Sequence, residues 1–155
     1  MSLHVLFKVG DAEYVVPASA VVQMDSFSGA TPVPGAPPYV SGIVQIRGRV
    51  IPVVDLRARF GLPPIERTLD ARIIVVSTND RQVGLLADSA REVIMIDETS
   101  FEQPPDVIVE QSRGFVSSIA QTGQRIVMRL RFEAVVTPEV LAPSFVQEQP
   151  RGTKA

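Results

Sequence analysis

The side chains that could carry out chemistry are few, and they are poorly placed for it. The 155-residue chain contains no cysteine and a single histidine, His4. The absence of thiols excludes disulfides, cysteine-ligated metals and cysteine nucleophiles. One histidine close to a terminus argues against a catalytic triad and against a multi-histidine metal site. Ser41, Ser117 and Ser118 therefore lack a base that would activate a hydroxyl.

Carboxylates offer the remaining route to catalysis, with Asp55, Asp88, Glu92 and Asp97 as the candidates. Asp88 and Glu92 are four residues apart, which would place both on one face of a helix, but a solvated helix face produces the same spacing. Asp55 stands before a short predicted helix and suits its N-cap. The segments 46–49 and 113–115 lack the glycine spacing and the lysine of a phosphate loop. We therefore expect no enzyme, no cofactor and no metal.

The basic side chains are mostly arginines, 13 of them against two lysines, within a formal net charge of −2. Arginine suits fixed pairing with carboxylates and protein interfaces. Arg47, Arg49, Arg57 and Arg59 lie close together in the chain, which favours either a solvated basic face or a surface for an acidic partner. Near-neutral charge and only 6% aromatic residues argue against a nucleic-acid surface.

Strand-forming residues dominate the elements that must position these side chains. The 24 Val and 11 Ile suit strands, while 13 Pro and 10 Gly supply turns, so the composition predicts an all-β protein. No apolar run reaches membrane-spanning length and no signal peptide is visible, so we expect a cytoplasmic protein. Pro52 is expected at a sheet edge or a bulge. Hairpins are predicted over 6–16, 39–55, 72–87 and 115–130, and a further strand over 92–96. Short helices are predicted over 17–24, 55–61 and 133–141. The remaining segments are predicted to be connectors, over 31–38 and 101–109, and a tail over 142–155.

An internal repeat relates two parts of the chain. A shift of 76 residues lays 39–43 over 115–119, 49–51 over 125–127, and Leu56 over Phe132. At a similar offset, 14–16 lies over 83–85. Chance matching of β-rich sequence is the alternative explanation. If the repeat is real, it predicts two small barrels in tandem with a cleft between them for a partner.

Residues 42–57 resemble the signature of the chemotaxis coupling protein family, the CheW-like domain, whose pattern is G-x-x-N-L-R-G-x-x-[IV]-P-[IV]-x-D-L. Gly42, Arg47, Gly48, Pro52 and Asp55 stand at its defining positions. The family's other motifs follow in order over residues 3–141. They are an opening hairpin with Phe7, Val9 and Tyr14, a segment with Pro37, Tyr39 and Val40, and a segment with Val83, Gly84, Leu85, Asp88, Glu92 and Val93.

The resemblance implies a fold of two five-stranded SH3-like β-barrel subdomains around a shared core, with short helices. These subdomains would be intertwined and cover roughly 14–70 and 71–135. It also implies a non-catalytic adaptor that couples the cytoplasmic tip of methyl-accepting chemoreceptors to the regulatory domain of a CheA-type histidine kinase. Such an adaptor would be recruited to receptor arrays at the inner membrane, without nucleic acid and without inserting into the membrane.

Site residues carry over from the family by motif. Arg47 and Gly48 fall in the receptor-facing loop, with Gly42 beside it. Val21, Gly84 and Val93 line up with positions near the receptor groove, whereas Pro52 and Asp55 have structural roles. Arg47 has an alternative role, in which an intramolecular bond shapes the loop.

Three departures from the family pattern change the charge of candidate surfaces. Gln45 replaces the usual Asn, Gln23 replaces an acidic residue, and Arg131 stands where an Asp is usual, with Arg129 nearby. Other functions therefore stay open. They are a β-barrel protein-binding module of another signalling system such as surface motility, a nucleic-acid-binding barrel, and a small carboxylate hydrolase.

Overall fold

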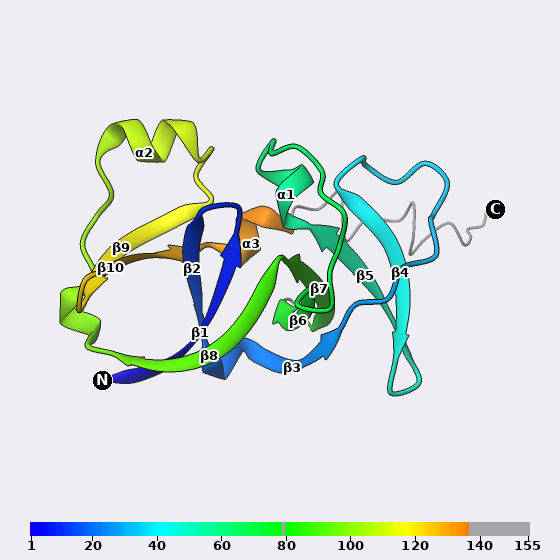
Figure 1. Ribbon diagram of the computed structural model, residues 1–155, viewed down its shortest axis with the longest axis horizontal. Helices are drawn as coiled ribbons and strands as arrows, with labels where there is room; N and C mark the ends of the chain where they lie inside the picture. The colour runs from blue at the N-terminus through cyan, green and yellow to red at the C-terminus, as the bar shows by residue number, and fades with distance from the viewer. Residues whose placement is uncertain (79, 137–155) are drawn as a thin grey trace.

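Antiparallel hairpins build most of the fold. The computed structural model describes residues 1–78 and 80–136. In this part of the chain, the strands form two five-stranded sheets (Figure 1). The first sheet has the order β8-β1-β2-β10-β9, with β1 (Ser2–Val9), β2 (Ala12–Pro17), β8 (Ser89–Ile96), β9 (Val116–Thr122) and β10 (Arg125–Leu130). The second has the order β3-β6-β7-β5-β4, with β3 (Val21–Ser26), β4 (Val40–Ile46), β5 (Arg49–Asp55), β6 (Arg72–Thr78) and β7 (Arg81–Ala87).

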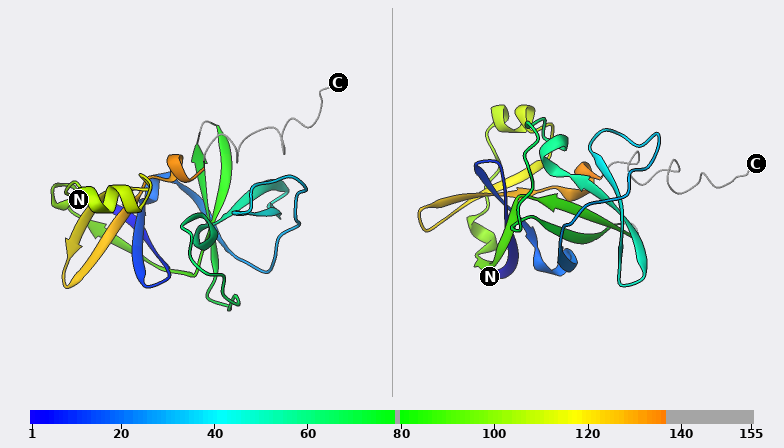
Figure 2. Two further views of the ribbon diagram at one scale, coloured as in Figure 1. Left: turned by 90° about the horizontal axis from the view of Figure 1, so that it is seen from above. Right: turned by 45° about the vertical axis from the view of Figure 1, so that its right-hand side comes forward.

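Short helices connect the strands. They are η1 (Ala18–Ala20), α1 (Leu56–Arg59), η2 (Glu98–Ser100), α2 (Asp106–Gln111) and α3 (Phe132–Val135). Seen from above, the first sheet occupies one half of the molecule and the second sheet the other half (Figure 2). None of the described helices is long and apolar enough to cross a bilayer.

Three clusters of buried apolar side chains stabilise the two sheets. Most central strands contribute to two clusters, because both of their faces are buried. Leu6, Val15 and Val127 pack in a cluster that belongs to the first sheet. The second sheet has its own cluster, which contains Ile51, Val53, Ala71, Ile73, Val75 and Leu86. The neighbouring residues of the same strands point the other way, into a larger shared core that joins the sheets and contains Val5, Phe7, Val54, Ile74, Val76 and Leu85. This alternation follows from the two-residue period of a strand.

The predicted repeat corresponds to equivalent places in the two sheets. In the first sheet β10 runs parallel to β2, with Arg129 opposite Val15. In the second sheet β5 runs parallel to β7, with Val53 opposite Gly84. Arg129 is 76 residues after Val53, and Gly84 is 69 residues after Val15, so the two pairings match the offsets seen in the sequence. The all-β class with two five-stranded units is therefore confirmed.

The two sheets nevertheless do not follow one another along the chain. The first sheet takes β1 and β2 from the start of the chain and β8, β9 and β10 from its later part, whereas the second sheet is formed by consecutive strands between Val21 and Ala87. The subdomains expected at roughly 14–70 and 71–135 were predicted to be intertwined, and the first hairpin pairs with strands from the later part of the chain. The expected tail, 142–155, lies outside the described residues.

Some predicted helices are wrong or shorter than expected. Residues 17–24 form only the single 3-10 turn η1 before β3, because the β-branched Val21 and Val22 favour a strand. The predicted connector 101–109 contains the start of α2, which begins directly after Pro105. The last predicted helix, 133–141, begins at Phe132, and its positions after 136 lie outside the described residues.

Of the two places predicted for Pro52, the sheet edge is wrong, because β5 lies between β7 and β4. A register shift of the β4–β5 ladder does lie close by, between Val40 and Gly42. The pairing partner of Pro52 in β4 is Ile43, whose N–H and C=O both bond to Thr31 on the other side, at 2.8 and 2.9 Å. Ile43 and Pro52 thus form a non-hydrogen-bonded pair in which β4 needs no N–H from the proline. Pairing of β5 with β7 begins only at Val53. The missing donor therefore breaks no bond of the β4–β5 ladder.

Candidate functional site: two groups of predicted residues

Arg47 and Gly48 form the two-residue turn between β4 and β5. Both have positive φ values, 52° and 80°, as a tight hairpin turn of the I′ kind requires. Both residues are exposed, and a Cβ at Gly48 would meet open space. None of the described residues forms a hydrogen bond or an ion pair with the Arg47 side chain. The turn therefore presents a cation to solvent, and no intramolecular bond from the described residues shapes it.

Gly42 lets the proline-rich connector lie against β4. Thr31 and Ile43 exchange two backbone hydrogen bonds, of 2.9 and 2.8 Å. Gly42 has φ 141°, and a Cβ added there would lie 2.1 Å from the carbonyl oxygen of Thr31. Only glycine permits this close approach. The family motif thus places Gly42 where the backbone needs it, beside the hairpin rather than on an exposed surface.

Gly84 is buried in β7 and faces the second sheet's own cluster. A Cβ at this position would lie 2.5 Å from Cγ2 of Ile73. Val53 lies opposite both Gly84 in β7 and Gly42 in β4, so the two glycines flank one buried valine. The structure therefore brings Gly42, Gly84 and the Arg47–Gly48 turn together on β4, β5 and β7.

Val21 and Val93 form a second group on the outermost strands β3 and β8. Val93 is opposite Val5, a residue of the shared core, yet its own side chain is 55% exposed. Val21 packs partly against the same core. Further exposed apolar side chains flank them, and together they form what we term the apolar margin: Leu3, Val21, Val22, Met24, Val93 and Met95.

The apolar margin follows from the register of the edge strands. Leu3 is opposite Met95, and Met24 is opposite Ile74 of the shared core. Leu3, Val93 and Met95 therefore lie on the face that the first sheet turns towards the shared core, at its outermost strands. Val21 and Met24 lie on the corresponding face of the second sheet, whereas Val22 stands in the register shift of β3. Exposed apolar side chains on the edge strands of both sheets are therefore candidates for a protein-binding surface.

The arginine-rich segment divides into two parts. Arg47 and Arg49 are exposed, whereas Arg57 and Arg59 turn inwards. The guanidinium of Arg59 lies 4.0 Å from the ring centroid of Tyr39, and its Nε donates to the carbonyl oxygen of Val135 at 3.1 Å. The four arginines therefore do not form a single basic face, and Arg47 and Arg49 are the two that face solvent.

Asp88 is the centre of an ion-pair network that sequence reasoning missed. Its Oδ2 accepts from Arg57 Nη1 and from the backbone N–H of Gly10, each at 2.8 Å. Its Oδ1 accepts from Arg67 Nη1 at 2.8 Å. Arg67 also donates to Asp55, which caps α1 by accepting from the N–H of Arg57. Asp88 and Glu92 do not share a helix face, because Asp88 stands between β7 and β8 while Glu92 lies within β8.

The departures from the family pattern lie at separate places. Gln23 is in β3 among the apolar margin residues, and Gln45 is exposed beside the Arg47 turn. Arg131 lies before α3, where its Nε donates to the carbonyl oxygen of Gly114 at 3.2 Å. Gln45 therefore lies beside a predicted site residue, whereas Gln23 is opposite Val75 of the second sheet's own cluster, on the other face of β3 from Met24.

Comparisons with known proteins agree with this geometry. The family model of the CheW-like domain matches residues 3–139. A chemotaxis protein CheW of Rhizobium meliloti (strain 1021) is 33% identical over 135 residues, which cover 87% of each protein. One of Bacillus subtilis (strain 168) is 32% identical over 135 residues, covering 87% of this chain and 86% of that protein. The crystal structure of the scaffolding protein TtCheW from Thermoanaerobacter tengcongensis superposes with a TM-score of 0.80, at 31% identity and 88% coverage of both chains.

The fold and the matches together define a two-sheet scaffold of chemosensory signalling. The chain belongs to the CheW-like domain family. Its role is that of an adaptor or scaffold in chemotaxis signalling, which confirms the resemblance seen in the sequence. The alternative functions are not favoured by these matches.

Proposed function

We propose that this chain couples the cytoplasmic tip of methyl-accepting chemoreceptors to the regulatory domain of a CheA-type histidine kinase, in the cytoplasm at receptor arrays. The apolar margin is the observation that carries the proposal. Receptor tips are helical hairpins, and a helix docks by laying an apolar face on such a surface. Arg47 at the neighbouring candidate surface has no partner among the described residues and supplies a cation for an acidic receptor side chain.

Different parts of the molecule serve the two partners in this proposal. The receptor takes the apolar margin together with the Arg47 turn. The kinase domain, which resembles this fold, docks on one end of a barrel. Receptor-surface variants should therefore leave kinase binding intact.

Co-sedimentation with receptor-containing membrane vesicles and purified kinase tests the proposal. Val93→Lys places a charge in the apolar margin and is expected to weaken receptor binding about tenfold or more. Val107→Lys is the matched control, because Val107 in α2 is 57% exposed and Val93 is 55% exposed. Kinase binding should be unchanged in both. Equal receptor binding by the two variants would contradict the assignment of this surface.

Arg47 is tested separately, with substitutions that tolerate the backbone conformation of the turn. Asp and Asn both tolerate the positive φ of this position, so neither substitution should unfold the turn. Arg47→Asp is expected to weaken receptor binding about tenfold, and Arg47→Asn by less. Loss of folding in both variants would support a structural role, and unchanged receptor binding would remove Arg47 from the interface.

A further inference from the structure

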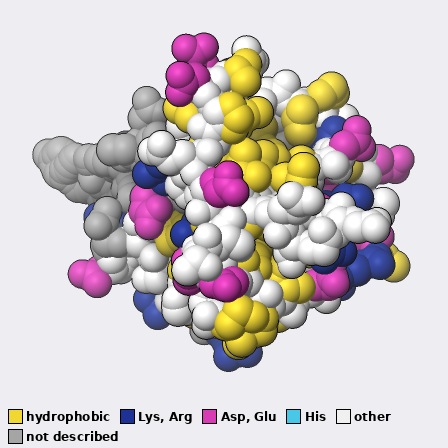
Figure 3. Space-filling model, turned by 90° about the vertical axis from the view of Figure 1, so that its left-hand side faces the viewer, with side chains coloured by type: hydrophobic (Ala, Val, Ile, Leu, Met, Phe, Trp, Pro, Cys, Tyr) yellow, Lys and Arg dark blue, Asp and Glu magenta, His cyan; other side chains and the backbone are white. Residues whose placement is uncertain are grey.

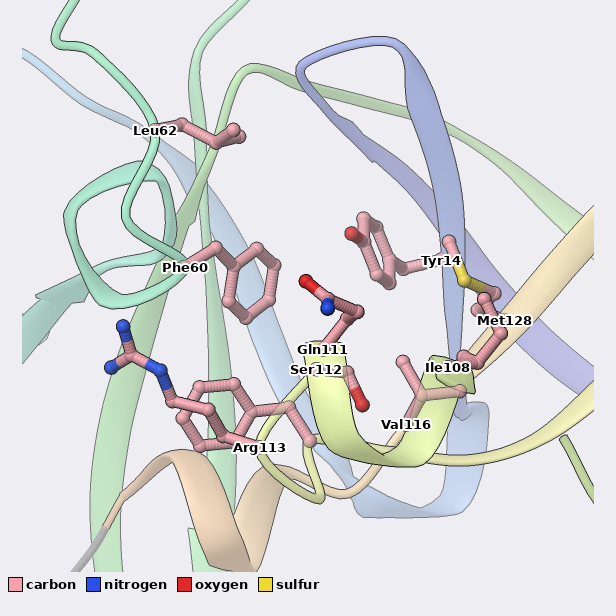
Figure 4. A pocket seen from close by; sticks show the side chains of 10 residues that line it. Tyr14, Phe60, Leu62, Ile108, Gln111, Ser112, Arg113, Val116 and Met128 are labelled. Atoms are coloured by element: carbon pink, nitrogen blue, oxygen red, sulfur yellow. The ribbon is translucent and has the colours of Figure 1, made fainter. Parts of the chain in front are cut away.

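A cavity of about 240 Å³ lies beneath α2, away from both predicted groups of site residues (Figure 4). Three aromatic rings form its main wall. Tyr14 lies 5.3 Å from Phe60, and Phe60 lies 5.7 Å from Phe115, both measured between ring centroids. Further apolar side chains complete the lining: Leu62, Ile108, Val116 and Met128.

The helix above the cavity, α2, is not anchored by buried side chains. None of the side chains of α2 is buried. In the space-filling view, hydrophobic side chains gather around α2 at the top of this face (Figure 3). The volume exceeds the roughly 150 Å³ of an apolar cavity known to admit benzene. An aromatic ring with a short substituent therefore fits the space.

Polar groups at the cavity are few, and one of them, the Ser112 hydroxyl, already donates to the carbonyl oxygen of Val109 at 3.4 Å. None of the described residues forms a hydrogen bond with the Tyr14 hydroxyl, which points into the cavity (Figure 4). The Gln111 amide lines the same space. Burial raises the pKa of Tyr14 above its usual value, so the phenol stays protonated and can donate. An apolar pocket with a few convergent polar groups is the usual form of a small-molecule site.

Charge at the cavity favours an anion. Arg113 is exposed at the rim, with a guanidinium nitrogen 3.9 Å from where a Cβ of Gly61 would lie. The described residues form no ion pair with the Arg113 guanidinium. The cavity lining contains no aspartate or glutamate. Behind Phe115, the Arg59 guanidinium lies 5.0 Å from the ring centroid and adds positive charge.

We propose that this cavity binds a small monocyclic aromatic carboxylate, with the ring against Tyr14, Phe60 and Phe115 and the carboxylate at Arg113. Ring contacts supply the apolar part of the affinity. The charge-assisted bond to arginine and the Tyr14 hydroxyl orient the ligand. Such a site would let an adaptor respond to a small molecule away from its proposed receptor surface.

Methionine methyl NMR tests this site with 3-phenylpropionate as the probe. The chain has four methionines, and each gives a separate signal in protein labelled with ¹³C at the methyl group. Met128 lines the cavity, whereas Met24 and Met95 belong to the apolar margin and serve as internal controls. We expect a saturable shift of the Met128 signal only. No saturation up to about 10 mM, or equal shifts of Met24 and Met95, would overturn the site.

Two variants separate the parts of the proposal. Ile108→Phe fills the cavity from a helix without buried side chains and should abolish the Met128 shift in a folded protein. Arg113→Asn keeps a residue that accepts φ 54° but removes the cation. The neutral 3-phenylpropanamide should bind the unmodified protein about tenfold more weakly than the acid, and Arg113→Asn should remove this difference. An unchanged preference for the acid in Arg113→Asn would overturn the role of Arg113.

Discussion

His4 shows how a residue that looks unimportant in the sequence acquires a role from its surroundings. It lies in β1 and is fully buried, with Nδ1 3.3 Å from the carbonyl oxygen of Ser2 and Nε2 3.3 Å from Arg129 Nη2. Its ring packs 5.4 Å from that of Phe101. Burial lowers the pKa of His4 below its ordinary value of 6.5, the Arg129 charge acts in the same direction, and the Ser2 carbonyl and Glu98 oppose it.

The first prediction is that stability falls as the pH drops below about 6.5. The unfolded chain then takes up a proton at His4 that the folded protein still excludes. One such proton contributes a slope of at most about 1.4 kcal/mol per pH unit. His4→Asn should flatten the pH dependence of the unfolding free energy, measured in urea between pH 7.5 and 5.5.

The carboxylates of Asp97 and Glu98 are not expected to contribute to the change in unfolding free energy over this pH range. The pKa values of Asp97 and Glu98 are lowered from 3.8 and 4.5, by hydrogen bonds from Thr99 and from Ser2 respectively. Their stabilising contribution is present above those ordinary values and is lost only as the pH falls further. An equal slope in His4→Asn would assign the effect to other groups.

Two glycines show what a motif can and cannot predict at the residue scale. Gly42 and Gly84 were singled out as receptor-binding positions by resemblance alone. The close approach of Thr31 to Gly42 and of Ile73 to Gly84 depends on how a connector and a neighbouring strand pack against each glycine, which the motif alone does not specify. By contrast, the exposed Arg47–Gly48 turn was predictable, because a two-residue hairpin turn depends only on its own residues.

At the scale of elements, Arg59 fastens α3 to α1. Its Nε and Nη2 donate to the carbonyl oxygens of Val135 and Ala134, at 3.1 and 3.5 Å. Its guanidinium also lies 4.0 Å from the centroid of Tyr39. These carbonyls belong to the last turn of a helix, where no further backbone donor reaches them. A helix of only four residues depends on such external bonds.

The second prediction is that Arg59→Ala loosens α3 without unfolding the sheets. Amide hydrogen exchange at Val135 and Val136 should accelerate about tenfold, because their opening no longer breaks the bonds to Arg59. Arg59→Lys keeps the charge but loses the planar guanidinium that stacks on Tyr39. Its exchange rates in α3 should lie between those of the unmodified protein and of Arg59→Ala. Arg49→Ala changes an exposed arginine of the hairpin and should leave exchange in α3 unchanged. Equal exchange in all three variants would contradict this role.

Hairpins were predicted more accurately than helices for a physical reason. The four hairpins combine alternating apolar residues with glycine or polar turns, and these signals are local. The helical prediction over 17–24 failed because β3 is recruited by pairing with β6. The helix α2 was missed because it has no buried face and so leaves no apolar period in the sequence.

At the scale of the whole molecule, the two copies of the repeat are joined by exchange of strands. The chain leaves β7 in the second sheet and enters β8 in the first sheet at Asp88. The backbone N–H of Asp88 donates to the carbonyl oxygen of Lys8 at 2.9 Å, and its side chain accepts from Gly10 in the first hairpin. Arg57 and Arg67 come from the α1 region. The network could not be predicted, since its members are up to 78 residues apart.

The third prediction is that Asp88→Ala destabilises the whole protein by about 3 kcal/mol, measured by urea unfolding. The Asp88 and Arg67 side chains are each only 18% exposed, and the loss of the carboxylate leaves Nη1 of Arg57, Nη1 of Arg67 and the Gly10 N–H without their acceptor. Asp88→Asn keeps an acceptor for Gly10 but not the charge, and should cost less.

The matched control is the ion pair between Asp70 and Arg91, whose side chains are 51% and 65% exposed. Asp70→Ala should change stability by less than about 0.5 kcal/mol, because an exposed pair gains little over hydrated charges. Asp88→Ala should also lower the cooperativity of unfolding, since the carboxylate bonds the second sheet's α1 region to the first sheet's hairpin. A cost of Asp88→Ala no larger than that of Asp70→Ala would mean that the shared core alone joins the two sheets.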